Sequence, residues 1–202
     1  MAYLLTDMMR LVREDLRDAG EADYTDAVII AGIRVALNEI NKVSPYQDVE
    51  TVTLTELSPF VDISTIDDLL EVVAAYYPVT STYEYWKNKR NVTRFGNTIR
   101  IEMDARPSGD DEEAYLECEK RHTLTELTST LRPYEEEALR VGAAANVATS
   151  NARPTINRQN VGGGKVPTTL MTWGQLKQRE FEGLLAEFPR KASSVYQLYS
   201  RD

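Results

Sequence analysis

Apolar residues in the first 45 positions recur at helical spacing in two runs. The first covers residues 3–19 and includes Leu4, Met8 and Leu11, spaced three or four residues apart. The second begins after Thr25, which suits a helix N-cap, and ends near residues 41–45. Because the connection GEADYT between them is short, the sequence predicts two antiparallel neighbouring helices.

The apolar period changes to that of strands in the middle of the chain. Residues 49–54 alternate between apolar and polar, and residues 69–79 form a mostly apolar run closed by Pro78. Residues 92–103 indicate a hairpin that turns at 95–97, and alternation resumes over 114–122. We therefore expect a small antiparallel sheet at about residues 48–122.

Helical spacing returns after this region. Pro133 suits a first helical position, and three glutamates follow it in the first turn (Glu135, Glu136 and Glu137). The small residues of GAAANVA then allow another helix to approach closely. Residues 153–168 contain three consecutive glycines and predict a flexible linker. Residues 170–188 form an amphipathic helix that Pro189 is expected to end, which leaves an extended tail over 189–202.

These elements predict an α+β fold that is mainly α. It is an antiparallel helical bundle with an inserted small antiparallel β-sheet and an extended C-terminal arm. Residues 1–152 would form the core and residues 153–202 the arm.

The composition is that of a soluble globular protein, with 42% hydrophobic and 27% charged residues. A single cysteine excludes an internal disulfide framework and suits a reducing compartment. No stretch approaches the roughly 20 apolar residues that a membrane span needs. We expect no membrane contact and assembly in the cytoplasm.

Charge divides unevenly along the chain, whose net charge is −9. From Asn151 onward, eight Lys and Arg residues stand against four Asp and Glu residues. The first 150 residues hold fifteen basic and twenty-eight acidic residues. An acidic body is a poor general binder of nucleic acid, and its basic tail suggests a second surface with a different partner.

Candidate catalytic and metal-binding residues are few. His122, the only histidine, has no nucleophile or acid at a motif spacing, and we interpret it as a surface or strand-end residue. Cys118 lies four residues before it, but structural zinc usually takes four protein ligands and no further Cys or His exists. The glycine run ending at Lys165 lacks the phosphate-loop pattern. The acid clusters at 67–68, 110–113 and 135–137 have no calcium-loop spacing. We expect no catalytic site, metal or cofactor.

Aromatic residues gather at Tyr83, Tyr85 and Trp86, beside the predicted sheet. Such a cluster can stack on bases or sugars, but aromatic residues next to a sheet more often belong to a core or an interface. As a hypothesis we assign these three residues, with Trp173 and Phe181, to contacts between subunits.

The order of these segments resembles the head-to-tail connector, or adaptor, proteins of tailed bacteriophages. RVALNEINKV is similar to the end of that family's second helix, and TVTLTELSPFVDISTIDDLLEVVAAYYP to its inserted sheet. RFGNTIRIEM and AYLECEKRHTLTEL then lead into TLRPYEEEALRVGAAANVATS. That family often places Leu-Pro before an acidic turn and a helix with Leu-x-x-Gly-Ala-Ala. This chain departs from it in having Arg132 before Pro133.

The resemblance implies a virion protein of the neck, between capsid and tail. It would form a ring, usually of twelve subunits, beneath the portal protein and would hold the next neck or tail component. Helices would line a channel that genomic DNA crosses without sequence-specific binding, and the sheet would lie at the periphery or join neighbouring subunits. The C-terminal arm would reach the portal through residues of its tip: Arg190, Lys191, Val195, Tyr196, Leu198, Tyr199 and Arg201.

Two other classes stay open. A stopper or tail-terminator protein would be built largely from β structure, which the N-terminal helix pair disfavours. A hydrolase or metal-dependent enzyme would depend on His122 and Cys118.

Overall fold

The computed structural model describes residues 3–18, 23–79, 88–109, 112–158 and 166–199, of which 151–158, 166–168 and 189–199 are described by their backbone alone. The chain divides into two compact units. We call residues 1–44 with 122–202 the helical unit, and residues 45–121 the β unit. The β unit is therefore inserted into the helical unit.

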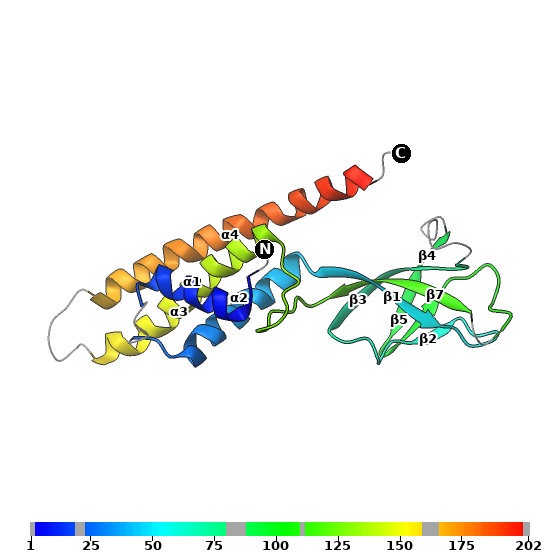
Figure 1. The fold of residues 1–202 in the computed structure, drawn as a ribbon, viewed down its shortest axis with the longest axis horizontal. Coiled ribbons are helices and arrows are strands. Elements are labelled where there is room, and N and C mark those ends of the chain that lie inside the picture. Colours follow the sequence, from blue (N-terminus) through cyan, green and yellow to red (C-terminus); the bar gives the residue numbers. More distant parts are fainter. Residues whose placement is uncertain (1–2, 19–22, 80–87, 110–111, 159–165, 200–202) are drawn as a thin grey trace. The chain divides into compact units, whose positions relative to one another are not determined.

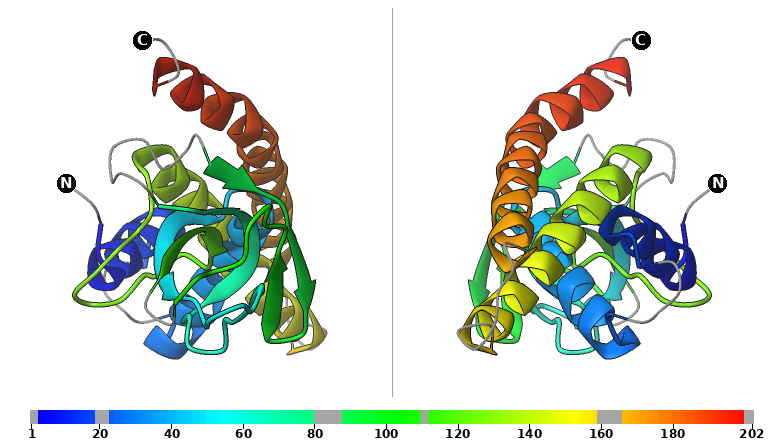
Figure 2. Two further views of the ribbon diagram at one scale, coloured as in Figure 1. Left: turned by 90° about the vertical axis from the view of Figure 1, so that its right-hand side faces the viewer. Right: turned by 90° about the vertical axis from the view of Figure 1, so that its left-hand side faces the viewer.

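Four helices form the described part of the helical unit: α1 (Leu5–Leu16), α2 (Asp26–Val43), α3 (Pro133–Arg158) and α4 (Val166–Tyr199). α3 and α4 lie side by side in Figures 1 and 2, and α3 also packs against α1 and α2. The core takes one apolar stripe from each helix, including Met8, Ile33, Leu139 and Phe181. Periodic burial of this kind is what makes these amphipathic segments helical in the folded chain.

Two glycines allow the helices to approach closely. A Cβ atom on Gly32 of α2 would lie 2.5 Å from the side chain of Val147 on α3. A Cβ atom on Gly142 of α3 would lie 2.8 Å from the ring of Phe181 on α4. The small residues around Gly142 thus fit a helix against them, as the sequence predicts. Larger side chains at either glycine would separate the helices.

A buried arginine joins the end of α1 to the start of α2. The Arg13 guanidinium donates to Asp18 Oδ2 at 2.8 Å, to the Tyr24 carbonyl at 2.8 Å and to Asp26 Oδ1 at 2.6 Å. Arg17 closes α1 in a left-handed conformation with φ of 58°, a position usually taken by glycine.

The β unit contains two antiparallel sheets in its described residues. The first has the order β1 (Tyr46–Thr53), β7 (Glu113–Lys120), β3 (Leu69–Tyr76) and β4 (Lys89–Arg90). The second has the order β2 (Phe60–Asp62), β6 (Thr98–Ile101) and β5 (Val92–Phe95). Both sheets share one core, to which Val61, Val72, Ile99, Leu116 and Cys118 contribute.

The fold confirms the α+β class, mainly α, with an antiparallel β insertion. The expected helix pair and the strands near residues 49–54, 69–79, 92–103 and 114–122 are all present. The hairpin turns at Gly96, whose φ is 63°. The second sheet was not expected, because the three residues of β2 are too few to show a period.

The C-terminal arm differs from the expectation. α3 continues to Arg158 and α4 begins at Val166, so helix covers most of the segment proposed as a linker at 153–168. Residues 159–165 lie outside the described residues. α4 also continues through Pro189 to Tyr199, where an extended tail was expected. A proline removes one hydrogen bond from a helix and can bend it, but it does not by itself end one.

Candidate functional site

The polypeptide passes from the helical unit to the β unit at Ser44 and returns at His122. The two residues are tied together, because His122 Nε2 lies 2.7 Å from the carbonyl oxygen of Ser44. The backbone N–H of His122 donates to Asn41 Oδ1 at 2.8 Å. Asn41 belongs to the last turn of α2 and Ser44 is its C-cap, so this end of the helix is joined directly to the segment that follows β7. We call these contacts the junction.

Glu135 completes the junction from the first turn of α3. Its Oε1 accepts the Ser44 hydroxyl at 2.7 Å, and its Oε2 accepts the Arg132 backbone N–H at 2.7 Å. The Glu135 side chain is fully buried, so these hydrogen bonds replace the water that the carboxylate loses. A carboxylate in the first turn also suits the helix dipole.

Both ring nitrogens of His122 have partners. Since Nε2 faces a carbonyl oxygen, a hydrogen on Nε2 satisfies that contact. Nδ1 then accepts from the hydroxyl of Thr130 at 3.2 Å, and the same hydroxyl oxygen accepts the Thr123 backbone N–H at 2.9 Å. The tautomer with hydrogen on Nε2 is assigned from this geometry. In it every donor in these contacts faces an acceptor.

The interpretation of His122 as a surface residue was wrong, although the residue does follow the end of a strand. Only 5% of the residue is exposed. The strand β7 ends at Lys120, two residues earlier, and Cys118 belongs to the core of the β unit. Strand alternation therefore does not continue to His122. Burial raises the pKa of the Cys118 thiol to about 11, which keeps it protonated.

The residue types of a hydrolase triad meet at the junction without the bonding pattern of a triad. The Ser44 hydroxyl donates to Glu135, and the His122 ring contacts the Ser44 backbone carbonyl. In a triad the histidine would accept the serine proton and the carboxylate would orient the histidine. Among the described residues, no group of three or more His, Cys, Asp or Glu side chains is arranged to hold a metal ion.

The residues proposed for contacts between subunits have different positions. Phe181 is 1% exposed and packs inside the helical unit, so within this fold its ring is not available to another subunit. Trp173 is partly buried against the same core. Tyr83, Tyr85 and Trp86 lie outside the described residues. The sequence shows that a helix has an apolar face. It does not show whether that face packs within the chain or against another subunit.

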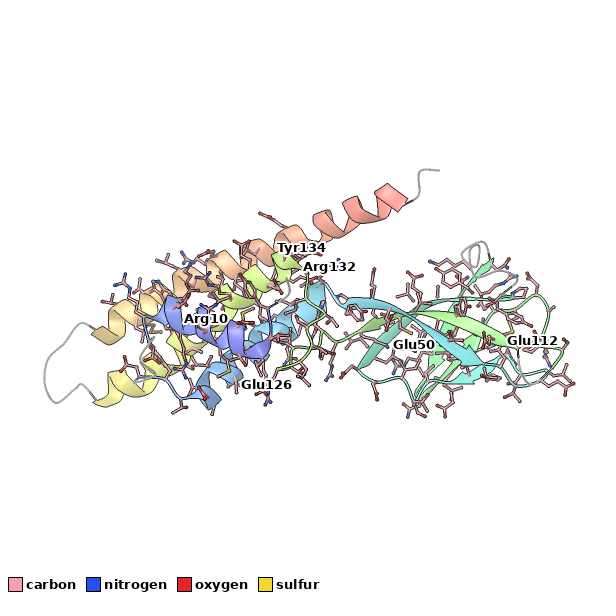
Figure 3. All side chains as sticks on the ribbon, viewed as in Figure 1. Arg10, Glu50, Glu112, Glu126, Arg132 and Tyr134 are labelled. Carbon is pink, nitrogen blue, oxygen red and sulfur yellow. The ribbon has the colours of Figure 1, made fainter. Side chains whose placement is uncertain are left out.

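The tip residues proposed for portal contact follow the last anchored residue of α4. Phe188 is 1% exposed, and its ring meets Tyr134 edge-on at a centroid distance of 5.2 Å. Tyr134 also accepts from Arg132 at 2.8 Å, at the start of α3 (Figure 3). The side chains of Arg190, Lys191, Val195, Tyr196, Leu198 and Tyr199 lie outside the described part, as does Arg201. The packed part of α4 thus ends at Phe188, within the described side chains.

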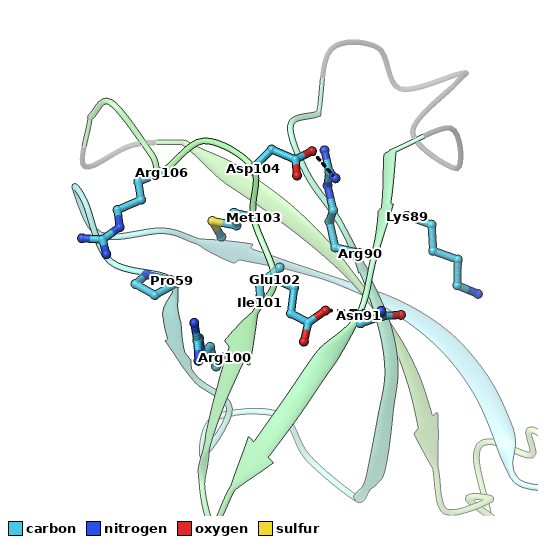
Figure 4. Close-up of a pocket in the computed structure, with 10 residues that line it drawn as sticks. All are labelled: Pro59, Lys89, Arg90, Asn91, Arg100, Ile101, Glu102, Met103, Asp104 and Arg106. Carbon is cyan, nitrogen blue, oxygen red and sulfur yellow. Dashed lines mark hydrogen bonds and ion pairs between the residues drawn. The ribbon is translucent and has the colours of Figure 1, made fainter.

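A cleft of about 470 Å³ opens on the β unit (Figure 4). Four basic residues border it, with two acidic residues among them: Lys89, Arg90, Arg100, Arg106, Glu102 and Asp104. The Lys89 side chain turns away from the cleft toward Glu117, so the cations that face the cleft are the three arginines (Figure 4). Arg90 donates to Asp104 at 2.6 Å and to the Tyr77 carbonyl at 3.0 Å. This cleft could not be predicted from the sequence, because its cations come from separate segments of an acidic region.

Acid dominates the β unit as a whole. Residues 45–121 contain sixteen Asp and Glu against eight Lys and Arg, for a net charge of −8. The helical unit therefore carries the remaining −1 of the total of −9. The acidic body inferred from the sequence is thus chiefly the β unit, which makes a lining of cations within it a local exception.

One carboxylate of the β unit is held strongly in its charged form. Glu112 accepts the Ser108 hydroxyl at 2.6 Å, the Ser108 backbone N–H at 2.7 Å and the Tyr77 hydroxyl. These hydrogen bonds, of which the one from the Ser108 hydroxyl has the largest effect, lower the pKa of Glu112 to about 2. Burial and the neighbouring Glu112 raise the pKa of Tyr77 to about 12. Figure 3 labels Glu112 in the β unit.

Comparison with known proteins gives little similarity. No family model matches the chain, and no curated protein matches it. One solved structure that resembles it is a chain from the neck of an empty GTA particle, computed with C6 symmetry. The two are 14% identical with a TM-score of 0.28, over 67% of this chain and 74% of the other. A similarity this low does not establish a common fold. None of the helices in the described residues is long and apolar enough to cross a membrane.

Proposed function

We propose that the chain is a structural subunit of the neck of a tailed phage, a ring-forming adaptor that binds the portal protein. The observation that supports this most is the order of elements along the fold. Two helices, a β insertion, a helix of small residues beginning at Pro133 and a final long helix follow in the order of the adaptor proteins that the sequence resembles. Because a fold does not by itself fix a function, the proposal needs the experiments below.

The junction supports an assembly role in place of a catalytic one. Ser44, His122 and Glu135 form hydrogen bonds with one another, with backbone groups and with the Thr130 hydroxyl, and all three are buried. Their geometry ties together the two chain segments of the helical unit between which the β unit is inserted. We therefore propose that the β unit and the helical unit supply docking surfaces.

The final part of α4 is the proposed portal-binding element. Phe188 is buried and is the last residue of α4 whose side chain is described, and the helix continues to Tyr199 (Figure 1). This segment contains two tyrosines, Tyr196 and Tyr199, of the type that often dominates interface energetics. Arg190 and Lys191 add positive charge to it. The proposed arm is thus a helix with an aromatic and basic end.

The helical unit carries almost no net charge, and the proposed passage of DNA through a channel is compatible with that. Binding to the phosphate backbone requires clustered Lys and Arg. A unit with a net charge of −1 over residues 1–44 and 122–202 offers no general excess of positive charge. We propose that DNA crosses the ring without specific contacts.

The first test asks whether the chain joins the portal. A variant lacking residues 190–202 is expected to remain folded and soluble and to lose co-sedimentation with portal rings. A matched control is the full chain with Lys177→Ala and Arg179→Ala, which changes charge on the packed part of α4 and is expected to co-sediment normally. Binding of the truncated chain at the wild-type level would contradict the portal contact.

The second test asks whether the chain completes the neck. Particles produced without it are expected to be capsids with packaged DNA that lack tails, visible by electron microscopy. A complete tailed particle made without the chain would overturn the proposed function. A stopper or tail terminator would instead leave the portal contact to another protein, so portal binding also separates these classes.

A further inference from the structure

The cations that line the cleft of the β unit are only partly neutralised within the chain. Arg90 is paired with Asp104 at 2.6 Å, and Glu102 accepts from Asn91 at 3.3 Å. Arg106 reaches only the Leu57 carbonyl, at 3.5 Å. Among the described residues, Arg100 and Arg106 form no ion pair, and both are exposed. The cleft therefore presents two unneutralised guanidinium groups to an anionic ligand.

The opposite charge gathers on the first sheet of the same unit. Glu71 of β3 stands directly opposite Glu119 of β7, and Glu117 lies two residues along the same strand face. We call these three residues the acidic row. Like charges directly opposite on a sheet are destabilising. Burial first, and then the charges of Glu71 and Glu117, raise the pKa of Glu119.

The row and the cleft lie on different sides of β4. Lys89 points to the row, where its Nζ is 3.4 Å from Glu117 Oε2, and the next residue, Arg90, points to Asp104 in the cleft. Successive side chains of a strand face opposite ways, which explains this division. One β unit therefore cannot fill its own cleft with its own row.

We propose that the acidic row of one copy of this chain binds in the cationic cleft of a second copy. The contact joins two different surfaces, so it repeats head-to-tail and can close into a ring. Arg100 and Arg106 would meet the carboxylates of Glu71 and Glu119. In the ring of the proposed function, these two surfaces would form the contact between neighbouring subunits. This inference therefore rests on the proposed function.

A second copy fits the cleft better than DNA does. The β unit has a net charge of −8, and a duplex presents about one phosphate per 1.7 Å, which brings dense negative charge against the whole unit. Between two copies, the guanidinium groups of the cleft and the carboxylates of the acidic row would come into direct contact. The remaining like charges lie farther apart and are screened over about 8 Å at physiological salt.

Charge reversal in the full-length protein tests the contact. We expect the wild-type chain to self-associate in sedimentation equilibrium, less so as NaCl is raised. The variant Arg100→Glu with Arg106→Glu is expected to associate at least about tenfold more weakly, and so is Glu71→Lys with Glu119→Lys. All four changes in one chain restore complementary charge, and association is expected to return. Restoration separates a direct contact from damage to the fold.

Matched controls change exposed charges outside both surfaces. Arg121→Glu and Asp67→Lys are expected to leave association unchanged. A monomeric wild type, or a quadruple variant that does not recover, would overturn the proposal. Binding of duplex DNA that is lost in Arg100→Glu with Arg106→Glu would assign the cleft to nucleic acid and overturn it too. The proposed function fails separately, when tailed particles form without the chain.

Discussion

The imidazole Nε2 of His122 lies 2.7 Å from the carbonyl oxygen of Ser44, which joins the residue that leaves the helical unit to the residue that returns to it. The contact is buried, and Glu135 and Asn41 hold the same two residues from α3 and α2. Local turns do not make this connection, since 77 residues lie between its two ends.

His122→Leu is expected to destabilise the chain by about 1–3 kcal/mol, because it removes the hydrogen-bond donor to the buried Ser44 carbonyl and the acceptor for the Thr130 hydroxyl. The measurement is a urea unfolding curve, in which the midpoint should fall. Glu126→Gln, a change at an exposed position near the junction, is the control and should have no measurable effect. An unchanged midpoint for His122→Leu would show that the junction does not stabilise the fold.

Gly142→Ala is expected to cost about 1–3 kcal/mol, since the new methyl group would lie 2.8 Å from the Phe181 ring in a packed core. Gly183→Ala makes the same change on α4, where nothing lies within 4 Å of the new atom. It should stabilise by about 0.5–1 kcal/mol, because alanine favours helix over glycine. Thermal unfolding of both variants would give opposite shifts. Equal shifts would contradict the close approach of α3 and α4.

Arg13→Ala is expected to destabilise by about 3–5 kcal/mol, because the buried charge of Asp18 would lose its ion pair with the Arg13 guanidinium. Arg10→Ala, on the same helix, removes an exposed pair with Glu14 and should cost less than about 0.5 kcal/mol. Denaturation of the two variants measures the difference. A small effect for Arg13→Ala would mean that α1 and α2 do not depend on this connection.

The stability of the β unit should fall at low pH through Glu112. Its pKa is lowered in the folded chain to about 2 from an ordinary value of 4.5. Its contribution is therefore fully present above pH 4.5 and is lost as pH falls toward 2. Glu112→Gln should flatten this part of the stability profile, followed by circular dichroism. Glu113→Gln is the control, and an unchanged profile for Glu112→Gln would contradict the assignment.

The helices and strands that could be predicted from the sequence are those in which buried residues recur at a regular spacing over several turns or several strand residues. Val28 to Ile40 on α2 and the alternation of β1 and β7 are examples, because each period samples the core face many times. β2 is three residues long and gives no period. Pro189 marked a helix end by local preference, but the helix continues beyond its anchor at Phe188.

Side-chain partners far apart in sequence could not be predicted. His122 contacts Ser44 and Glu135, which are distant from it in the sequence, so its environment depends on tertiary structure. The cationic cleft likewise draws Arg90, Arg100 and Arg106 from separate segments. The net charge of each segment does not reveal these arginines, because acidic residues next to them in the sequence cancel their charge.

The placement of the β unit also bears on how the chain can change over time. Both of its ends attach at one point of the helical unit, between Ser44 and His122. The entropy cost of closing a loop grows only with the logarithm of its length, so a shorter or longer segment would connect the same helices at nearly the same cost. We therefore expect that another segment could replace the β unit between Ser44 and His122 while α1 to α4 keep their packing.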